Sequence, residues 1–457
     1  MDTKKLRQKI LDLAIHGKLV PQDPNDEPAS VLLERIRIEK EKLIKEGKIK
    51  APKKSKSDTD TSHYPKEVPF EVPEGWIWST LGAISSYGFC PSIQVEQISD
   101  NSWVLELEDI EKDTGKLISK KTKIERSANG IRYSFERGQV LYSKLRTYLN
   151  KVLIAEQKGF CSTEIMPISF YGGVLAEYMV IVLSSPYFLD YTASCGYGVK
   201  MPRLGTNDAI KAAIPIPPLA EQRIIVRQVK QLLSLIDELS CLKETLSIDI
   251  ENVKHRILEL AIQGKLVPQA PIEEPAIELL RRINSNFQAS DNLHYDGKLP
   301  PGWALCCLED ILDYEQPQTY IVNSTDYSDD NKTPVLTPGK SFVLGYTNEV
   351  FGICNRLPVI IFDDFTTDSK YVDFPFKVKS SAMKILHARG KINLRYVAHF
   401  MSITRLAGDT HKRYWISEYS KIPIPIPPLR EQEKIVSTVQ RLFNQLDNLI
   451  AGIEDDL

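Results

Sequence analysis

The sequence predicts an α+β protein in which two dissimilar domains are joined by an antiparallel, coiled-coil-like pair of long helices. The arrangement is a pseudo-twofold, circularly permuted repeat. Three observations lead to this prediction: two pairs of repeated segments, an apolar seam with helical spacing, and two intervening segments that do not resemble each other. Internal repeats are examined first because they decide the architecture.

The repeats come in two pairs with different offsets. Residues 10–36 reappear at 257–283, an offset of 247, and residues 214–239 reappear at 424–449, an offset of 210. At these offsets Leu457 maps onto Ser247 and Met1 maps onto Ile248. The two ends therefore abut in the image of one central segment. This predicts two similar halves, with the second connector made from the last and the first residues together.

Composition limits the class of protein. A length of 457 residues suggests roughly three domains of about 150 residues, and 42% hydrophobic with 26% charged residues is typical of globular chains. No apolar run reaches the ~18 residues of a membrane helix, and the N-terminus lacks a signal-peptide core. The seven cysteines contain no C-x-x-C pair. We therefore expect a cytoplasmic protein with reduced thiols and no metal site.

The central connector, residues 219–283, opens with a long helix. Apolar residues recur at intervals of three and four from Ile225 to Leu260, after Pro218 and before Gly264. Such spacing indicates a heptad-like seam, and a glycine just past the last apolar residue marks a helix end. About 45 residues at ~1.5 Å each give a rod of roughly 65–70 Å.

The partner of this rod is expected in two pieces. The distal helix, residues 429–457, repeats the first half of the seam, and the N-terminal segment, residues 1–36, repeats the second half and completes the distal scaffold. The pair would be antiparallel. We expect residues 1–15 to cover four apolar side chains: Leu242, Leu246, Ile250 and Val253. The alternative, a solvent-facing helix in an ordinary helical domain, would make the abutting repeats a coincidence.

Two variable domains lie between the connectors, at 65–218 and 284–428. Both open with a Pro–Gly–Trp motif that aligns Trp76 with Trp303, and they then diverge. Short β-branched runs predict strands at 139–142, 152–155, 335–336 and 359–362, and apolar periodicity predicts helices at 176–183 and 394–403. Residues 37–64, rich in Lys, Ser and Asp, are expected to be a helix that fades into a charged linker.

Several motifs carry a resemblance to a known family. The twin IPIPPLAEQ (214–222) and IPIPPLREQ (424–432) segments and the LAIxGKLVPQ boxes at 13–22 and 260–269 resemble the conserved regions of specificity subunits of type I restriction–modification enzymes. SKLRTYLNKV (143–152), FCSTE (160–164) and GYGVKMPRL (196–204) are similar to motifs of their target recognition domains. VLTPGKSFVLGYT (335–347) and IIFDDFTTDSKYVDFPF (360–376) resemble another class of such domains.

The resemblance implies a non-catalytic subunit that reads an asymmetric, bipartite target in double-stranded DNA. Each target recognition domain would read one half-site, and the helices would hold the two domains apart. Two modification (methyltransferase) subunits and the restriction (motor–nuclease) subunits would dock on the scaffold. S-adenosylmethionine would be bound by the modification subunit and ATP with Mg²⁺ by the restriction subunit, and this chain would hold no cofactor.

Two other functions are possible for such a chain. A DNA methyltransferase or nuclease with fused recognition domains would need a cofactor or phosphate loop, and neither glycine-rich pattern occurs. Its nearest candidates are SSPYF at 184–188, expected instead to be a surface turn, and a carboxylate cluster of Asp363, Asp364 and Asp368. A pure coiled-coil adaptor would not need two dissimilar α+β domains. The net charge of −2 excludes only a wholly basic DNA binder, because phosphate contacts need just a basic patch.

Candidate DNA contacts combine cations, hydroxyls and amphipathic rings. In the first domain they are Lys144, Arg146, Tyr148, Lys151, Lys200 and Arg203. In the second they are Lys340, Thr366, Thr367, Ser369, Lys370, Tyr371, Arg413 and Tyr414. Arg146 and Arg203 could equally tie loops together, and Tyr148 and Trp415 could be core. The duplicated Glu221–Gln222 and Glu431–Gln432 pairs are candidates for partner binding, although a Glu in a first helical turn also suits the helix dipole.

Overall fold

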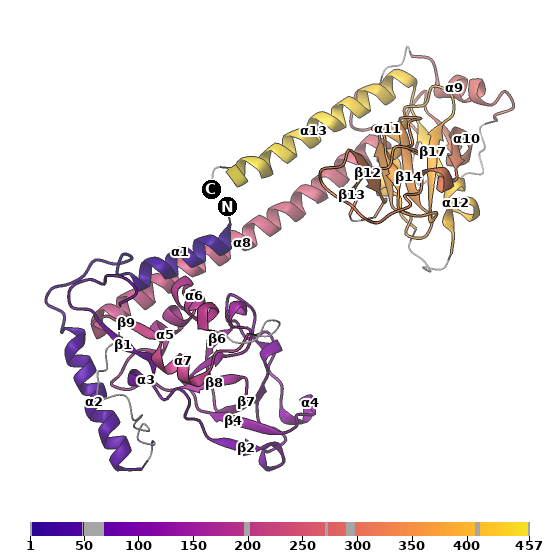
Figure 1. The fold of residues 1–457 in the computed structure, drawn as a ribbon. Coiled ribbons are helices and arrows are strands. Elements are labelled where there is room, and N and C mark those ends of the chain that lie inside the picture. The colour runs from indigo at the N-terminus through magenta and orange to yellow at the C-terminus, as the bar shows by residue number, and fades with distance from the viewer. Residues whose placement is uncertain are drawn as a thin grey trace. The chain divides into compact units, whose positions relative to one another are not determined.

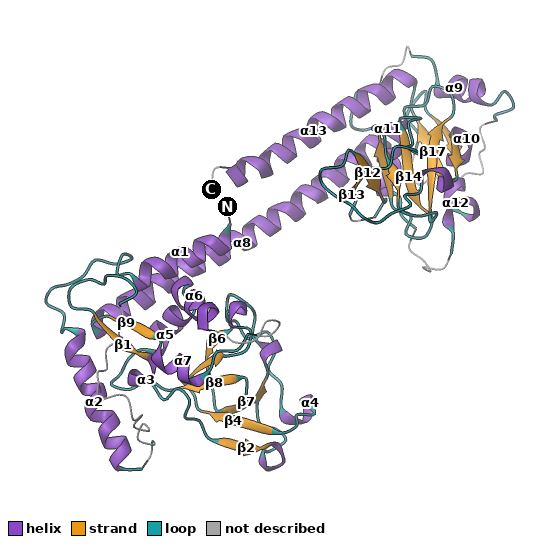
Figure 2. Cartoon of the chain, in the orientation of Figure 1, coloured by secondary structure: helices purple, strands orange, loops and turns teal. Residues whose placement is uncertain are grey.

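The structure, a computed structural model, describes residues 2–47, 49, 68–195, 202–269, 273–288, 298–339, 341–406 and 412–455 (Figures 1 and 2). It forms two compact units, Met1–Leu242 and Lys243–Leu457. Helix α8 (Leu219–Ile262) supplies its first part to unit 1 and its last part to unit 2. Among the described residues, no helix is both long and apolar enough to cross a membrane.

Unit 1 contains helices at both ends of a β-rich domain. Its α-helices are α1 (Thr3–Ile15), α2 (Ala29–Lys45), α3 (Leu81–Ile84), α4 (Lys123–Arg126), α5 (Ala176–Leu183), α6 (Pro186–Cys195), α7 (Thr206–Lys211) and the first part of α8. Its 3-10 helices are η1 (Val95–Gln97), η2 (Leu107–Asp109) and η3 (Thr147–Leu149). Its strands are β1 (Ile77–Thr80), β2 (Ser92–Gln94), β3 (Val104–Leu105), β4 (Ile131–Phe135), β5 (Val140–Ser143), β6 (Val152–Ile154), β7 (Gly159–Ser162), β8 (Ile165–Ile168) and β9 (Ala213–Ile216).

Unit 2 has the same general plan with different internal elements. Its α-helices are the last part of α8, α9 (Ala276–Ile283), α10 (Leu308–Ile311), α11 (Leu394–Ile403), α12 (Tyr414–Ser417) and α13 (Leu429–Asp455), and its 3-10 helices are η4 (Pro317–Tyr320) and η5 (Tyr419–Lys421). Its strands are β10 (Ala304–Cys307), β11 (Leu312–Glu315), β12 (Thr333–Leu336), β13 (Val343–Thr347), β14 (Val359–Asp363), β15 (Ser369–Val372), β16 (Lys377–Val378), β17 (Met383–Ala388) and β18 (Pro423–Ile426).

The central helix is confirmed, and each unit contains an antiparallel helix pair. In unit 1, Arg7 of α1 pairs with Asp237 of α8, while Gln22 reaches back to Glu221 at the start of α8. In unit 2, Lys254 of α8 pairs with Asp447 of α13 at 2.8 Å, and Gln269, beyond the end of α8, reaches Glu431 at the start of α13. The falling residue numbers on one helix against rising numbers on the other show that the partners run in opposite directions.

The expected contact surface of the N-terminal helix is wrong in its position. In unit 1, α1 packs along the first part of α8, and its buried face (Ile10, Leu11, Ala14 and Ile15) shares a core with Ile225, Val226, Val229 and Ile236. Leu242 is 58% exposed in unit 1 and Val253 is 45% exposed in unit 2. The reason is register: with Arg7 opposite Asp237, residues 10–15 face positions before 237 rather than 242–253.

A two-stranded ribbon in each unit joins the Pro–Gly–Trp opening to the proline-rich repeat. In unit 1, β1 pairs with β9 antiparallel, with Trp78 opposite Pro215. In unit 2, β10 pairs with β18, with Leu305 opposite Pro425. Proline is tolerated here because each strand of the ribbon has one edge that needs no backbone donor. Thus the two most similar motifs of each half meet at the base of its domain.

The sheets above these ribbons differ between the units. In unit 1 the strand orders are β2-β4-β7-β3 and β6-β5-β8, and in unit 2 they are β11-β17-β14-β15 and β13-β12-β16. The helices predicted at 176–183 and 394–403 are confirmed as α5 and α11, and each of the four predicted strands is found within a residue or two. Helix α2 continues to Lys45, inside the expected linker, while residues 48 and 50–67 lie outside the described residues.

Candidate nucleic-acid interface

A buried carboxylate fastens the domain of unit 1 to the start of α8. The Oε2 atom of Glu221 accepts a hydrogen bond from the Trp76 indole at 2.8 Å, and Oε1 accepts one from the Gln22 amide at 3.1 Å. The same Gln22 amide donates to the carbonyl of Gly17 at 2.7 Å. Glu221 is only 2% exposed. We call Gln22, Trp76, Glu221 and Gln222 the anchor cluster of unit 1.

Unit 2 contains a matching anchor cluster, Gln269, Trp303, Glu431 and Gln432. The Gln269 amide donates to Oε1 of Glu431 at 2.8 Å and to the carbonyl of Gly264 at 2.9 Å. Glu431 is 1% exposed, and Trp303 is buried at the position that matches Trp76. The two offsets of the sequence repeat therefore bring equivalent residues to equivalent places in the two units.

In both clusters the side chain of the second glutamine, Gln222 or Gln432, forms hydrogen bonds with backbone groups of the variable domain. The Gln222 amide donates to the carbonyl of Pro217 at 3.0 Å, and its oxygen accepts from the backbone of Leu175, just before α5, at 3.1 Å. Gln432 makes the same contacts with Pro427 at 2.9 Å and Asn393 at 2.9 Å.

These contacts give the four proposed partner-binding residues an internal role instead. Glu221, Gln222, Glu431 and Gln432 are each 2% exposed or less, so a docking partner cannot touch their side chains on this surface. First-turn glutamates suit the helix dipole, but here the carboxylates are held by specific donors as well.

Two tyrosines reinforce these joints and were not predicted from the sequence. The hydroxyl of Tyr178 in α5 donates to the carbonyl of Pro215 at 2.8 Å, and that of Tyr396 in α11 donates to Pro425 at 2.7 Å. Both side chains are fully buried. The signal was hidden because these residues are 218 positions apart, which matches neither offset of the repeats.

In unit 1 the motif at 143–152 forms an exposed loop, residues 144–151, that we call the reading loop. Arg146 and Asn150 flank η3 in the left-handed backbone region, with φ of 51° and 49°. Such φ values are uncommon for residues other than glycine and are often found at functional sites. Asn150 and Thr147 point inward, whereas Tyr148 is 56% exposed and Arg146 is exposed. The loop therefore presents one cation and one aromatic ring to solvent.

Residues 202–204, the described end of the GYGVKMPRL motif, lie against the reading loop. The backbone N–H of Arg146 donates to Pro202 at 2.7 Å, that of Leu204 donates to Lys144 at 2.9 Å, and Leu145 stands opposite Arg203. The guanidinium of Arg203 forms an ion pair with Glu164. The alternative role, in which an arginine ties loops together, therefore fits Arg203 better than Arg146. Lys200 lies outside the described residues.

The lysines of the reading loop are held by the domain itself. The ammonium of Lys144 lies 5.6 Å from the centre of the Tyr133 ring. That of Lys151 donates to the carbonyl of Leu107 at 2.7 Å, and partial burial lowers its pKa. Among the described candidates of unit 1, Arg146 and Tyr148 are therefore the side chains that remain most available to a ligand.

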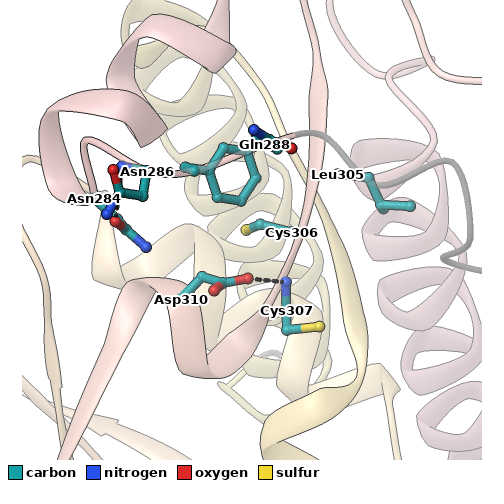
Figure 3. Close-up of a pocket in the computed structure, with 8 residues that line it drawn as sticks. Asn284, Asn286, Gln288, Leu305, Cys306, Cys307 and Asp310 are labelled. Atoms are coloured by element: carbon teal, nitrogen blue, oxygen red, sulfur yellow. Dashed lines mark hydrogen bonds between the residues drawn. The ribbon is translucent and has the colours of Figure 1, made fainter.

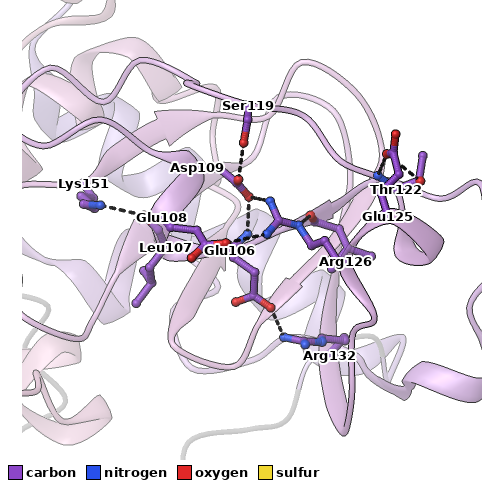
Figure 4. A network of polar contacts seen from close by, with 11 residues as sticks. Glu106, Leu107, Glu108, Asp109, Ser119, Thr122, Glu125, Arg126, Arg132 and Lys151 are labelled. Carbon is purple, nitrogen blue, oxygen red and sulfur yellow. Dashed lines mark hydrogen bonds and ion pairs between the residues drawn. The ribbon is translucent and has the colours of Figure 1, made fainter. Parts of the chain in front are cut away.

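An ion-pair network around η2 contacts the reading loop through Lys151 (Figure 4). Asp109, which is 1% exposed, accepts from Ser119 at 2.5 Å and pairs with Arg126. Arg126 also pairs with Glu108 at 3.1 Å, and Arg132 pairs with Glu106 at 2.7 Å. These charges neutralise one another around η2, so the network holds the carbonyl of Leu107 where Lys151 reaches it.

In unit 2 the candidates gather at the turn between β14 and β15. Asp363 caps this turn by accepting the backbone N–H groups of Phe365 at 2.8 Å and Thr366 at 3.0 Å. Thr367 adopts a φ of 59° and is fully buried, with its hydroxyl accepting from Leu406. Thr366 remains exposed at the tip of the turn.

Neighbouring candidates of unit 2 divide into exposed and packed residues. Lys370 and Arg413 are exposed, and the Arg413 guanidinium lies 5.9 Å from the Phe365 ring. Tyr414 and Trp415 are buried, and their backbone N–H groups donate to Asp364, each at 2.8 Å. Of the remaining candidates, Ser369 is half-buried, and the centre of the Tyr371 ring lies 4.2 Å from the Arg395 guanidinium. Lys340 lies outside the described residues.

Comparisons with known proteins agree with this duplicated architecture. Residues 300–457 match the family model of the type I restriction modification DNA specificity domain. The specificity subunit of the type I restriction enzyme EcoEI of Escherichia coli is 30% identical over 99% of this chain and 91% of its own length. The chain belongs to the family of type I restriction enzyme specificity subunits.

Other specificity subunits of this family match in part. Those of EcoR124I/EcoR124II and EcoAI, both from Escherichia coli, are 46% and 32% identical, over 33% and 68% of this chain. These matches span only 39% and 62% of the relatives' lengths. A chain solved in a study of complex assembly and conformational transition of the type I R-M system shares the fold. It has a TM-score of 0.63, 19% identity, and coverage of 85% of this chain and 95% of that one.

The two sets of residues considered as catalytic candidates, the aspartate cluster and residues 184–188, make structural contacts in this chain. Asp364 pairs with the buried Lys384 at 3.5 Å, and Asp368 pairs with Arg405 at 2.9 Å. Within the described ranges, no three His, Cys, Asp or Glu side chains are grouped to hold a metal. The expected surface turn at 184–188 is wrong, because α6 already begins at Pro186 and both Ser185 and Phe188 are fully buried.

A pocket in unit 2 lies beside β10 and α10 (Figure 3). It is lined by Asn284, Asn286, Phe287, Gln288, Leu305, Cys306, Cys307 and Asp310. The Asp310 carboxylate accepts from the backbone of Cys307 at 2.7 Å and so caps α10. Burial raises the pKa of the Cys306 thiol well above its ordinary value, so this sulfur remains protonated and weakly nucleophilic.

Proposed function

We propose that this chain is the DNA-recognition subunit of a type I restriction–modification complex and works in the cytoplasm. Each unit would read one half of an asymmetric, bipartite target. The observation that carries the proposal is the pair of anchor clusters. Equivalent residues of these clusters, Gln222 and Gln432, join two dissimilar β-rich domains to one helical scaffold through the backbones of Leu175 and Asn393. A fixed frame with exchangeable domains is what a two-part reader requires, because half-site position follows protein geometry.

The exposed residues of each domain fit contacts with double-stranded DNA. In unit 1, Arg146 could donate two hydrogen bonds to guanine in the major groove, and Tyr148 could contact sugar or phosphate. In unit 2, Lys370 and Arg413 offer phosphate contacts and Thr366 a hydroxyl beside them. Because the two surfaces share no arrangement of side chains, the two half-sites should differ in sequence.

The duplicated helix pairs support the proposed partners. Two copies of a modification subunit would bind the two similar scaffold surfaces by near-equivalent contacts, as repeated surfaces bind repeated partners. Restriction subunits would join that assembly. In this proposal the chain is non-catalytic, with S-adenosylmethionine on the modification subunit and ATP with Mg²⁺ on the restriction subunit.

The direct test is to map modified bases. The chain co-expressed with its modification partner should place methyl groups at one asymmetric sequence made of two half-sites and a fixed, unread spacer. Single-base mapping of methylation in host DNA would show this pattern. The matched control is the partner co-expressed with an R146A/Y148A variant, which should lose selectivity mainly in one half-site. Methylation without a bipartite pattern would reject the proposal.

A second test separates a reader from an enzyme. The purified chain should show no saturable binding of S-adenosylmethionine in calorimetry, whereas the complex with the modification partner should bind it. The expectation rests on the family, in which the chain is a specificity subunit rather than a methyltransferase. Stoichiometric binding to the chain alone would favour the fused-methyltransferase alternative.

A further inference from the structure

The scaffold ion pair is duplicated, and among the described residues only the copy in unit 1 contacts a variable domain. Arg7 with Asp237 in unit 1 corresponds, through the offsets of 247 and 210, to Lys254 with Asp447 in unit 2. Asp237 also accepts the ammonium of Lys116, from the variable domain of unit 1, at 2.7 Å. For Asp447, the described part of unit 2 supplies Lys254 as the one ion-pair partner found.

Lys116 belongs to a tight loop, residues 111–116, that touches both scaffold helices of unit 1. Asp113 pairs with Lys4 of α1 at 3.1 Å, whereas Lys116 contacts Asp237 of α8. Inside the loop, the backbone N–H of Glu111 donates to the carbonyl of Lys116 at 2.8 Å. The loop is therefore closed on itself and tied to α1 by one charge and to α8 by the other.

The other side of this loop rests on the reading loop. The backbone N–H of Asp113 donates to the carbonyl of Leu149 at 3.1 Å. At Gly115, φ is +68° and a Cβ atom would lie 1.9 Å from the carbonyl oxygen of Val152, so only glycine allows this approach. Leu149 is in η3, beside the exposed Tyr148. A continuous set of contacts thus leads from the scaffold to the side chains that are proposed to read DNA.

We infer that residues 111–116 act as a strut that fixes where the reading loop of unit 1 stands along the scaffold. The strut would make the complex selective for one spacer length between the half-sites. Lys116 and Asp113 are positioning residues, since neither needs to touch a base. This inference rests on the proposed function and adds a device for spacing to it.

The experiment compares Lys116→Glu with Lys112→Glu in the full chain, each co-purified with its modification partner. Lys112 lies in the same loop, is exposed, and has no ion-pair or hydrogen-bond partner found among the described residues. Both variants make the same change of charge, but only K116E places a carboxylate against Asp237. Methylation rates are measured on duplexes that carry both half-sites with the natural spacer, or with a spacer one base pair shorter or longer.

We expect K116E to raise the rate on altered spacers, relative to the natural one, by about two- to five-fold, the range set by a partly exposed ion pair. K112E and the conservative K116R should behave as wild type, and the bases preferred in each half-site should not change. An unchanged spacer profile in K116E would overturn the inference, and so would a parallel loss on all spacers or a changed base preference. If wild type itself shows no bipartite selectivity, the proposed function fails instead.

Discussion

Replacing Glu221 with alanine should lower the free energy of unfolding of unit 1 by about 2–4 kcal/mol at pH 5. The change removes two hydrogen bonds to one carboxylate and leaves the buried Trp76 indole without its acceptor. A typical hydrogen bond contributes a net ~0.5–1.5 kcal/mol, and leaving a buried donor unpaired costs about 1–3 kcal/mol. Glu431→Ala should change the stability of unit 2 in the same direction but by less, because Gln269 is the side chain that donates to Glu431 there.

Denaturant unfolding of the full chain, with hydrogen exchange to assign the effect, would measure this loss. Backbone protection should fall near the start of α8 in E221A and near the start of α13 in E431A. Glu238→Ala is the matched control: Glu238 is an exposed residue of α8 with no partner found within the described ranges. Its effect should stay within about 0.5 kcal/mol. An equal loss in E238A would show that helix composition, and not the anchor cluster, sets the stability.

The pH dependence of the same variants provides an independent check. Burial raises the pKa of Glu221 above its ordinary value of 4.5, although the bonds from Gln22 and Trp76 oppose the rise. The folded state therefore holds the proton more tightly than the unfolded state does. The stabilising contribution of this group is complete at low pH and falls as the pH rises from 4.5 through the raised pKa. The difference in the free energy of unfolding between wild type and E221A should narrow over that window. The difference between wild type and E238A should not change with pH.

Much of the scaffold could be predicted from the sequence because helical periodicity and repeats are local or directly comparable signals. The seam from Ile225 to Leu260 and the stop at Gly264 located α8, which ends at Ile262. The register of α1 was misplaced because periodicity does not say which turns of two helices meet. The ion pair of Arg7 with Asp237 settles that point, and it joins residues 230 positions apart.

The anchor clusters show why side-chain roles are harder to predict than elements. Glu221 was recognised as a duplicated first-turn carboxylate, and a solvent-facing role was a reasonable expectation for a charged residue. Its burial depends on Trp76 and Gln22, which come from separate segments of the chain. In the same way, Thr367 and Tyr414 belong to polar motifs, but the turn after β14 and the short helix α12 direct them into the core.

The reading loop was better predicted, since its motif is contiguous. The sequence could not show that Arg146 and Asn150 adopt positive φ, because that conformation depends on contacts from Pro202 and from the loop at 111–116. It is this backbone that separates the exposed Arg146 and Tyr148 from the inward-facing Thr147. A linear motif thus located the surface, and tertiary contacts selected which of its side chains face solvent.

Exchanging the recognition segment of unit 1 should change one half of the target and leave the other half intact. The structure places the cut sites at residues 81 and 212. Trp76, β1 and β9 then stay with the scaffold, and the segment between them carries the reading loop. The donor would be the equivalent segment of a relative with a different target. The reciprocal exchange in unit 2 spans residues 308–422, between β10 and β18, and serves as the matched control.

The expected effect is large because every mismatched base pair costs roughly 1–3 kcal/mol, and three mismatches would reduce modification of the old half-site by about 100-fold or more. Single-base methylation mapping of the two exchanged chains should give two hybrid targets, each keeping the half-site of the unexchanged unit. Retention follows from the anchor clusters: Gln222 and Gln432 bind the recognition segments of their own units at Leu175 and Asn393. A unit 1 exchange that altered both half-sites would contradict independent reading. A hybrid with correct half-sites and a changed spacer would instead be expected from a donor that lacks a counterpart of Lys116, because Asp237 would lose its contact with the recognition domain.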